Sequence, residues 1–242
     1  MPNTNGHKTV FLETFGCQMN VLDSELVTGQ LRRLGYDFVD DREQADVLLY
    51  NTCSVRQHAE DKAYARVGDA KPLKRRRPHV VLGVIGCMAE RDGEAMLRRY
   101  PQVDLLVGPG ELDQLPGLID EVIANRTPRA ALQGSTARRS GTLDAARDEL
   151  ELLDLGRSIS PEDHNASAYV RITRGCNKFC TYCVVPFTRG PEVHRPPDHI
   201  VDECRRLADA GVIEVTLLGQ TVNHYRYDHG AAVTSQGVQQ PQ

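Results

Sequence analysis

The sequence has no export or membrane segment, no tryptophan and no excess of basic charge. Its N-terminus, MPNTNGHKTVFLETFG, has no basic head followed by an apolar run, and no later segment reaches the roughly 18 apolar residues of a membrane-spanning helix. Tryptophan is absent. The net charge of −4, from 29 basic and 33 acidic residues, does not by itself predict nucleic-acid binding. We therefore expect a cytoplasmic protein with no membrane partner.

Cysteine, in contrast, is plentiful, with seven in 242 residues. In a reducing compartment, cysteines are better interpreted as metal ligands, catalytic thiols or core residues than as disulfides. Three of them, Cys176, Cys180 and Cys183, lie within the eight residues CNKFCTYC, spaced C-x3-C-x2-C. Structural zinc sites close with four ligands and disulfides use cysteines in pairs, so a set of three needs another explanation.

Short apolar segments alternate with helix-like segments over the first half of the chain. The expected strands are 8–15, 46–51, 79–85 and 103–107. The expected helices between and after them are 21–34, 55–71, 88–99 and 111–124. This alternation predicts an α/β fold whose N-terminal domain is a doubly wound parallel sheet.

Changes in composition divide the chain into three parts. We expect an N-terminal domain at 1–128 and a linker at 129–165, rich in Gly, Ser and charged residues, with a short helix around 143–153. A second domain occupies 166–242. It begins with another β-α-β pattern, made of the strand YVRITRG, the cysteine loop, a helix at 198–210 and a strand at 213–219.

Three further cysteines each follow an expected strand: Cys17 in TFGC, Cys53 in YNTC and Cys87 in VIGC. The carboxyl ends of parallel strands lie at one edge of a sheet, where ligands bind. We therefore expect these thiols to converge although they are distant in sequence. Gly16 and Gly86 beside them would let the backbone approach a bulky inorganic cofactor closely.

A set of three thiolates suits a 4Fe-4S cube that keeps one iron open, as a catalytic zinc keeps one open position. Zinc is the alternative metal, but neither set has an obvious fourth ligand. His194 or His199 could complete a tetrahedron at the second set, and we interpret both as surface or loop residues. Cys204 shares a helical face with Ile200 and Leu207, which predicts a packing role.

Several stretches together resemble the methylthiotransferase family of radical S-adenosylmethionine (SAM) enzymes. They are TFGCQMNVLDSE (14–25), NTCSVR (51–56), GVIGCMAER (83–91), RGCNKFCTYCVVPFTRGPEVHRP (174–196) and VTLLGQTVN (215–223). The residues after Cys17 and Cys53 are most similar to the branch that makes 2-methylthio-N6-dimethylallyladenosine in tRNA. Pro191 and His194 depart from the family pattern without touching the cysteines.

The resemblance implies roles for individual residues. Cys176, Cys180 and Cys183 would ligate the 4Fe-4S cluster that cleaves SAM. Cys17, Cys53 and Cys87 would ligate an auxiliary 4Fe-4S cluster that provides the inserted sulfur, which a second SAM methylates. Tyr182 would flank the SAM adenine, and Gln220 is a weaker candidate for its methionine end. The product would be isopentenyl-adenosine methylthiolated at C2, next to the anticodon.

The resemblance also implies partners and architecture. The expected partners are the tRNA anticodon stem-loop and an electron donor protein such as a flavodoxin or ferredoxin. Residues 166–242 would supply only the first β/α units of a partial TIM-like barrel, so we expect the chain to be an inactive fragment of the enzyme. The alternatives are a sister methylthiotransferase, acting on threonylcarbamoyl-adenosine in tRNA or on a ribosomal-protein aspartate, and a metal-stabilised binding module without redox chemistry.

Two groups of basic residues are candidates for phosphate binding. One is the run Lys71, Lys74, Arg75, Arg76 and Arg77, for which a solvated helix end is an equal alternative. The other surrounds the cysteine loop and consists of Arg171, Arg174, Lys178, Arg189 and Arg195. For the second group we favour a functional role, because positive charge also favours thiolates.

Overall fold

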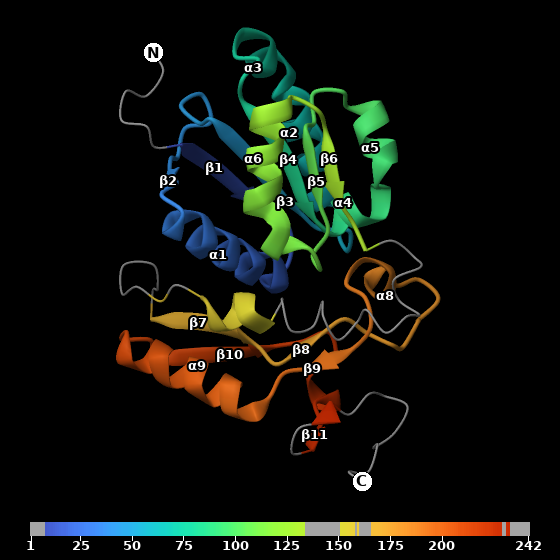
Figure 1. The fold of residues 1–242 in the computed structure, drawn as a ribbon. Helices are drawn as coiled ribbons and strands as arrows, with labels where there is room; N and C mark the ends of the chain where they lie inside the picture. Colours follow the sequence, from blue (N-terminus) through green and yellow to red (C-terminus); the bar gives the residue numbers. More distant parts are fainter. Residues whose placement is uncertain (1–7, 134–150, 158, 160–165, 229–230, 233–242) are drawn as a thin grey trace.

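The computed structural model of the chain describes residues 8–133, 151–157, 159, 166–228 and 231–232. Its N-terminal part is a parallel sheet in the order β2-β1-β3-β4-β5-β6 (Figure 1). The strands are β1 (Thr9–Thr14), β2 (Asp37–Phe38), β3 (Val47–Thr52), β4 (Val81–Gly86), β5 (Leu105–Val107) and β6 (Arg129–Ala131). The predicted α/β fold class is confirmed.

The two central strands explain why this sheet forms. β3 (VLLYNT) and β4 (VLGVIG) are buried along their whole length, as expected for continuous apolar strands covered on both faces. Their register pairs Asn51 with Ile85 and Thr52 with Gly86. The two strands therefore end at the same level, and the residues that follow them emerge side by side.

Helices cover both faces of the sheet. α1 (Gln18–Arg33) and α6 (Leu115–Asn125) pack on one face. The other face carries α2 (Gln57–Asp69), α3 (Lys71–Arg76), α4 (Cys87–Asp92) and α5 (Glu94–Arg99). The single helix predicted at 88–99 is in fact two, because Gly93 adopts a φ of 52° that helical residues do not have. Within the described ranges, no helix is both long and apolar enough to cross a membrane.

The predicted start of the linker at residue 129 needs correction. Arg129–Ala131 pairs in parallel with β5 and extends the N-terminal sheet as its edge strand. Only Ala131 of the three is buried, so backbone pairing and not an apolar pattern defines this strand. Most of the helix predicted at 143–153 lies outside the described residues, although 151–155 are helical.

The second part contains one β-α-β unit. β7 (Ser167–Arg171) pairs in parallel with β10 (Glu214–Leu218), and α9 (Pro197–Asp209) packs against β7. Cys204 packs beside the core of this unit, as predicted. The smaller elements are η1 (Leu112–Gln114) in the first part, and β8 (Thr173–Arg174), α8 (Val185–Thr188), β9 (Val193–His194), η3 (Val222–His224), β11 (Tyr227–Asp228) and β12 (Ala231–Ala232) in the second.

Helix α1 lies between the N-terminal sheet and β7, so it belongs to both parts (Figure 1). Leu153, from the segment before β7, and Leu218 of β10 join the same buried cluster as Leu22 and Leu26 of α1. Charged side chains are buried here as well. Six of these, each at most 4% exposed, are Asp23, Asp154, Arg157, Arg171, Arg195 and Glu203.

The buried arginines are neutralised by buried carboxylates. Arg195 Nη1 lies 2.7 Å from Glu203 Oε2, and Arg157 Nη1 lies 3.1 Å from Glu203 Oε1. Burial alone would raise the pKa of Asp154, but the charges of Arg171, Arg174 and Arg195 hold it well below its usual range. Five basic residues around the cysteine loop were predicted to bind phosphate. Four of them form internal ion pairs instead: Arg171, Arg174, Arg189 and Arg195.

Replacing Glu203 should show how strongly the second part depends on these pairs. In Glu203→Ala, Arg157 and Arg195 lose a shared carboxylate while they stay buried, so we expect the free energy of unfolding to fall by about 3–5 kcal/mol. Asp202→Ala, the adjacent control, removes only an exposed pair with Arg205 and should change stability by less than about 0.5 kcal/mol. Urea unfolding of both variants measures the difference, and equal midpoints would contradict the argument.

Candidate functional site

The strand order reverses between β1 and β3, because β2 lies outside β1 while the later strands follow β3. In doubly wound sheets, ligands bind outside the carboxyl ends of the strands at this switch point. Cys17 caps the start of α1 just after β1, and Cys53 directly follows β3. Cys87 begins α4 at the end of β4, the next strand. The sheet thus brings the first cysteine set together at the expected edge.

Two glycines allow the strand ends to come this close. A Cβ on Gly16 would lie 2.2 Å from Cys53 Cβ and 2.8 Å from Cys53 Sγ, and a Cβ on Gly86 would lie 2.6 Å from Thr52 O. Both have positive φ, 123° for Gly16 and 90° for Gly86. In the structure, these glycines serve the approach of one strand end to its neighbour.

A network of buried side-chain amides, not predicted from the sequence, holds the helical turn that carries Cys17. Cys17 Sγ lies 3.1 Å from Asn20 Oδ1, and Asn20 Nδ2 donates to Asn51 Oδ1 and to Thr52 O, both at 2.9 Å. Asn51 Nδ2 in turn donates to Ser24 Oγ at 2.8 Å. Asn20 and Asn51 are fully buried. The network ties the first turn of α1 to the end of β3. Its only traces in the sequence are the polar last residues of β3 and the asparagine three residues after Cys17.

The Cys17 thiol donates to Asn20 Oδ1, while other neighbours lower its pKa. The Cys53 thiol donates to it and lowers its pKa, against the effect of burial, and the backbone N–H of Asn20 and the charge of Arg189 lower it further. The same contact with Cys17, together with burial, raises the pKa of Cys53. Thiolates are the form of cysteine that binds metal.

The first cysteine set offers three thiol donors at the ends of three neighbouring strands. In the part of the chain that the structure describes, no three His, Cys, Asp or Glu side chains are arranged to hold one metal ion. An iron–sulfur cluster contains several metal atoms, so its ligands surround it and need not meet at one point. The hydroxyl Ser54 Oγ, next to Cys53 in the chain, is buried and has no hydrogen-bond partner. These residues fit a cluster held by three thiolates.

The second cysteine set lies in one loop between β8 and α8. Cys176 is buried, Cys183 is half-buried and Cys180 is exposed. The loop is closed by a hydrogen bond from Cys176 N to Gly190 O at 3.1 Å and turns at Cys180, whose O accepts from Cys183 N at 2.9 Å. These two hydrogen bonds fix the base of the loop and the turn that carries Cys180 and Cys183.

Residues expected near SAM lie beside this loop. Gln220 follows β10, next to Thr221, whose Oγ1 lies 4.0 Å from Cys176 Sγ. Gln220 Oε1 and Thr173 Oγ1 are buried without a partner, as suits a site that a polar ligand completes. Tyr182 is 91% exposed and free to cover a ligand.

One prediction about a neighbouring residue needs correction. His194, expected at the surface, is 1% exposed, because β9 turns its ring edge-on to Tyr225 at 5.8 Å. His199 is half-exposed and contacts Glu151 at 3.2 Å.

The basic run at 71–77 is largely paired with acidic residues: Lys74 with Asp104, Arg76 with Glu43 and Arg77 with Asp46. This favours the structural interpretation of that run.

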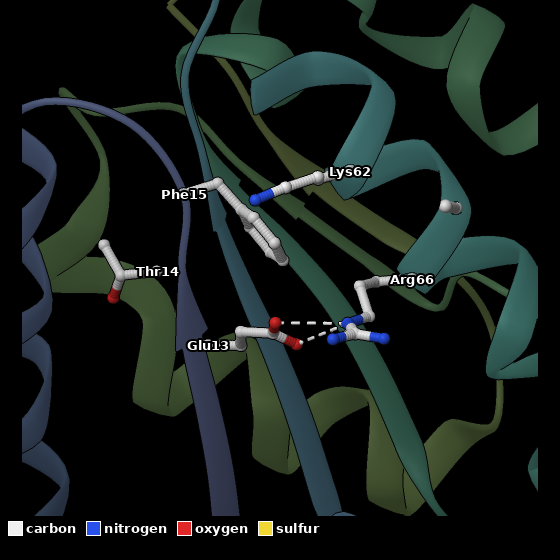
Figure 2. Close-up of a pocket in the computed structure, with 6 residues that line it drawn as sticks. Glu13, Thr14, Phe15, Lys62 and Arg66 are labelled. Carbon is white, nitrogen blue, oxygen red and sulfur yellow. Dashed lines mark hydrogen bonds and ion pairs between the residues drawn. The ribbon is translucent and has the colours of Figure 1, made fainter. Parts of the chain in front are cut away.

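A pocket of about 340 Å³ opens on the α2 side of the sheet (Figure 2). It is lined by Glu13, Thr14, Phe15, Lys62, Ala65 and Arg66. Lys62 points toward the Phe15 ring, and Arg66 Nε lies 3.1 Å from each Glu13 oxygen. None of the cysteines lines it, so this hollow and the cysteine site are separate features.

Gly16→Ala should damage the first cysteine set specifically. The new Cβ would meet Cys53 and force an unfavourable φ, so we expect a loss of roughly 1–3 kcal/mol of stability and faster alkylation of Cys53 in the metal-free chain. Gly117→Ala in α6 is the control, since its Cβ would meet nothing within 4 Å. Thermal unfolding and mass spectrometry of alkylated peptides measure both effects. Equal behaviour of the two variants would refute the packing argument.

Family comparisons match both parts. Residues 9–108 match the model described as uncharacterized protein family UPF0004, and residues 170–234 match the Radical SAM superfamily. Between them, these matches include all six cysteines of the two sets.

Curated relatives extend across the junction. Proteins named tRNA-2-methylthio-N(6)-dimethylallyladenosine synthase are 49% identical in Rhodopirellula baltica, 45% in Dichelobacter nodosus and 46% in Acidithiobacillus ferrooxidans, each over 220 residues. The alignments cover 91%, 90% and 90% of this chain and 46%, 45% and 46% of the relatives. The chain thus spans about half the length of the curated relatives it matches. Its two parts thus match the UPF0004 and Radical SAM models, and over about 90% of its length the chain is similar to these synthases.

Proposed function

We propose that this protein takes part in the methylthiolation of tRNA at C2 of isopentenyl-adenosine next to the anticodon. Membership of the radical SAM superfamily implies SAM and iron–sulfur chemistry. The observation that carries the proposal is the combination of two cysteine sets, one at the switch point of a parallel sheet and one in a C-x3-C-x2-C loop. The names of the relatives supply the reaction.

Each cysteine set has a proposed role. Cys17, Cys53 and Cys87 hold an auxiliary 4Fe-4S cluster, and the second set, Cys176, Cys180 and Cys183, holds the cluster that binds SAM. When bound, the clusters and SAM supply the one-electron cleavage of SAM and the sulfur and methyl groups of the product. The three-thiolate sets support this assignment, because they leave one metal position of each cluster open.

The chain's own residues orient these groups. Asn20 is locked by Asn51 and Thr52, so the first turn of α1 presents Cys17 at a fixed position. Gln220 and Thr173 offer unpaired polar atoms to SAM. Tyr182, directly before Cys183, is placed to cover the adenine ring by stacking.

The RNA partner follows from the chemistry. A reaction at a base carbon requires the base to leave the stack, which an anticodon loop permits at low cost. Of the basic residues around the cysteine loop, Lys178 is exposed and thus available to a phosphate. An electron donor protein such as a flavodoxin or ferredoxin completes the proposed set of partners.

Metal analysis tests the two-cluster assignment. Protein purified without oxygen should be brown and contain about eight iron atoms, and Cys180→Ala or Cys53→Ala should each lower iron by about half. Cys204→Ala is the matched control and should keep full iron, because Cys204 packs against the α9 core. Stoichiometric zinc in place of iron would support a binding module instead.

Nucleoside analysis tests the reaction. In cells that lack the gene, 2-methylthio-isopentenyl-adenosine should disappear from tRNA and its unmodified precursor should accumulate. Expression of the intact gene should restore it, and expression of the gene with Cys53→Ala should not. Loss of methylthiolated threonylcarbamoyl-adenosine instead would assign the protein to a sister branch of the family.

A further inference from the structure

One buried carboxylate touches both parts of the molecule next to both cysteine sets. Asp23 lies in α1, the helix that Cys17 caps, and is 1% exposed. Its two oxygens each accept from a different arginine of the second part. Neither arginine comes from the sheet that carries the first cysteine set.

These two arginines stand on either side of the second cysteine set. Arg171 ends β7, shortly before Cys176, and its Nη1 lies 3.0 Å from Asp23 Oδ1. Arg189 follows α8, shortly after Cys183, and its Nη2 lies 2.8 Å from Asp23 Oδ2. One carboxylate therefore holds the entry and the exit of the cysteine loop against the helix of the first set.

Other contacts of the loop point in the same direction. α8 packs against α4, the helix that begins at Cys87. The guanidinium of Arg189 is buried, and although burial opposes its charge, Asp23 and the nearby Cys87 and Cys17 side chains raise its pKa. Arg189 thus lies within electrostatic reach of the first set while its own segment belongs to the second.

We propose that Asp23 is a positioning residue, which fixes the two cysteine sets relative to each other by holding Arg171 and Arg189. The position of Asp23 between the two arginines does not depend on the proposed function. Only the consequence, a fixed spacing between two clusters, rests on it. Buried ion pairs contribute little net stability compared with apolar packing, but they do fix geometry, since each charge must meet its partner. A carboxylate with two guanidinium partners restricts the position of both.

The interface provides a matched control on the same helix. Glu25, two residues after Asp23, also binds a buried arginine of the second part, Arg157. Arg157 lies before β7 and contacts Glu203 of α9, and so does not flank the cysteine loop. Glu25→Gln weakens the same interface without releasing that loop.

Thiol cross-linking of the metal-free chain tests the proposal directly. Bis-maleimides of increasing length are applied under native conditions, and mass spectrometry identifies links between the two cysteine sets. We expect a narrow range of productive lengths for the unaltered chain and for Glu25→Gln. Asp23→Asn and Arg189→Gln should broaden this range and lower the yield with the shortest productive reagent severalfold.

Arg189→Lys and iron-loaded protein complete the design. Lysine keeps the charge, so it should restore part of the narrow range. In protein loaded with iron and sulfide, Asp23→Asn should weaken the magnetic interaction between the reduced clusters, while Glu25→Gln should not. Unchanged cross-link lengths in folded Asp23→Asn, or equal broadening in Glu25→Gln, would overturn the proposal. Failure of the proposed function would appear instead as absent iron with cross-linking unaffected.

Discussion

The arrangement of the molecule depends on the pairing of buried arginines with buried carboxylates around helix α1. A guanidinium that leaves water must meet an acceptor, and here the acceptors come from α1, from the segment before β7 and from α9. Apolar contacts of Leu153 and Leu218 with the N-terminal core close the same interface. Burial of apolar side chains stabilises this interface, and the ion pairs fix the positions of the segments that meet there.

The cysteine site follows from sheet geometry and from very little else. Parallel strands that end in register deliver their next residues to one place, and glycine at positive φ lets those residues approach. The neutral amides of Asn20 and Asn51 then fix the first helical turn without adding charge beside the sulfurs. The electrostatic potential at Cys17 is therefore set by backbone N–H groups, a neighbouring thiol and Arg189.

The strands, and the positions of Cys17, Cys53 and Cys87 just after them, could be predicted from sequence, because apolar runs and residue spacing are local properties. The break at Gly93 was missed because a single glycine inside a helical pattern is often tolerated. β6 was missed because an exposed edge strand carries no apolar pattern. The arginines around the cysteine loop were assigned to phosphate because their carboxylate partners, such as Asp23, lie far away in the chain. A charge pattern shows that a partner is needed but not which one.

The place of α1 between two layers has a consequence for motion. Most surface helices can fray or detach while the sheet beneath them stays intact, because only one of their faces is covered. α1 has apolar contacts on its sheet side and salt bridges to the second part, so detaching it would expose a hydrophobic face and unpaired charges together. We therefore expect its amides to be among those that exchange with solvent only when the sheet and the second part separate.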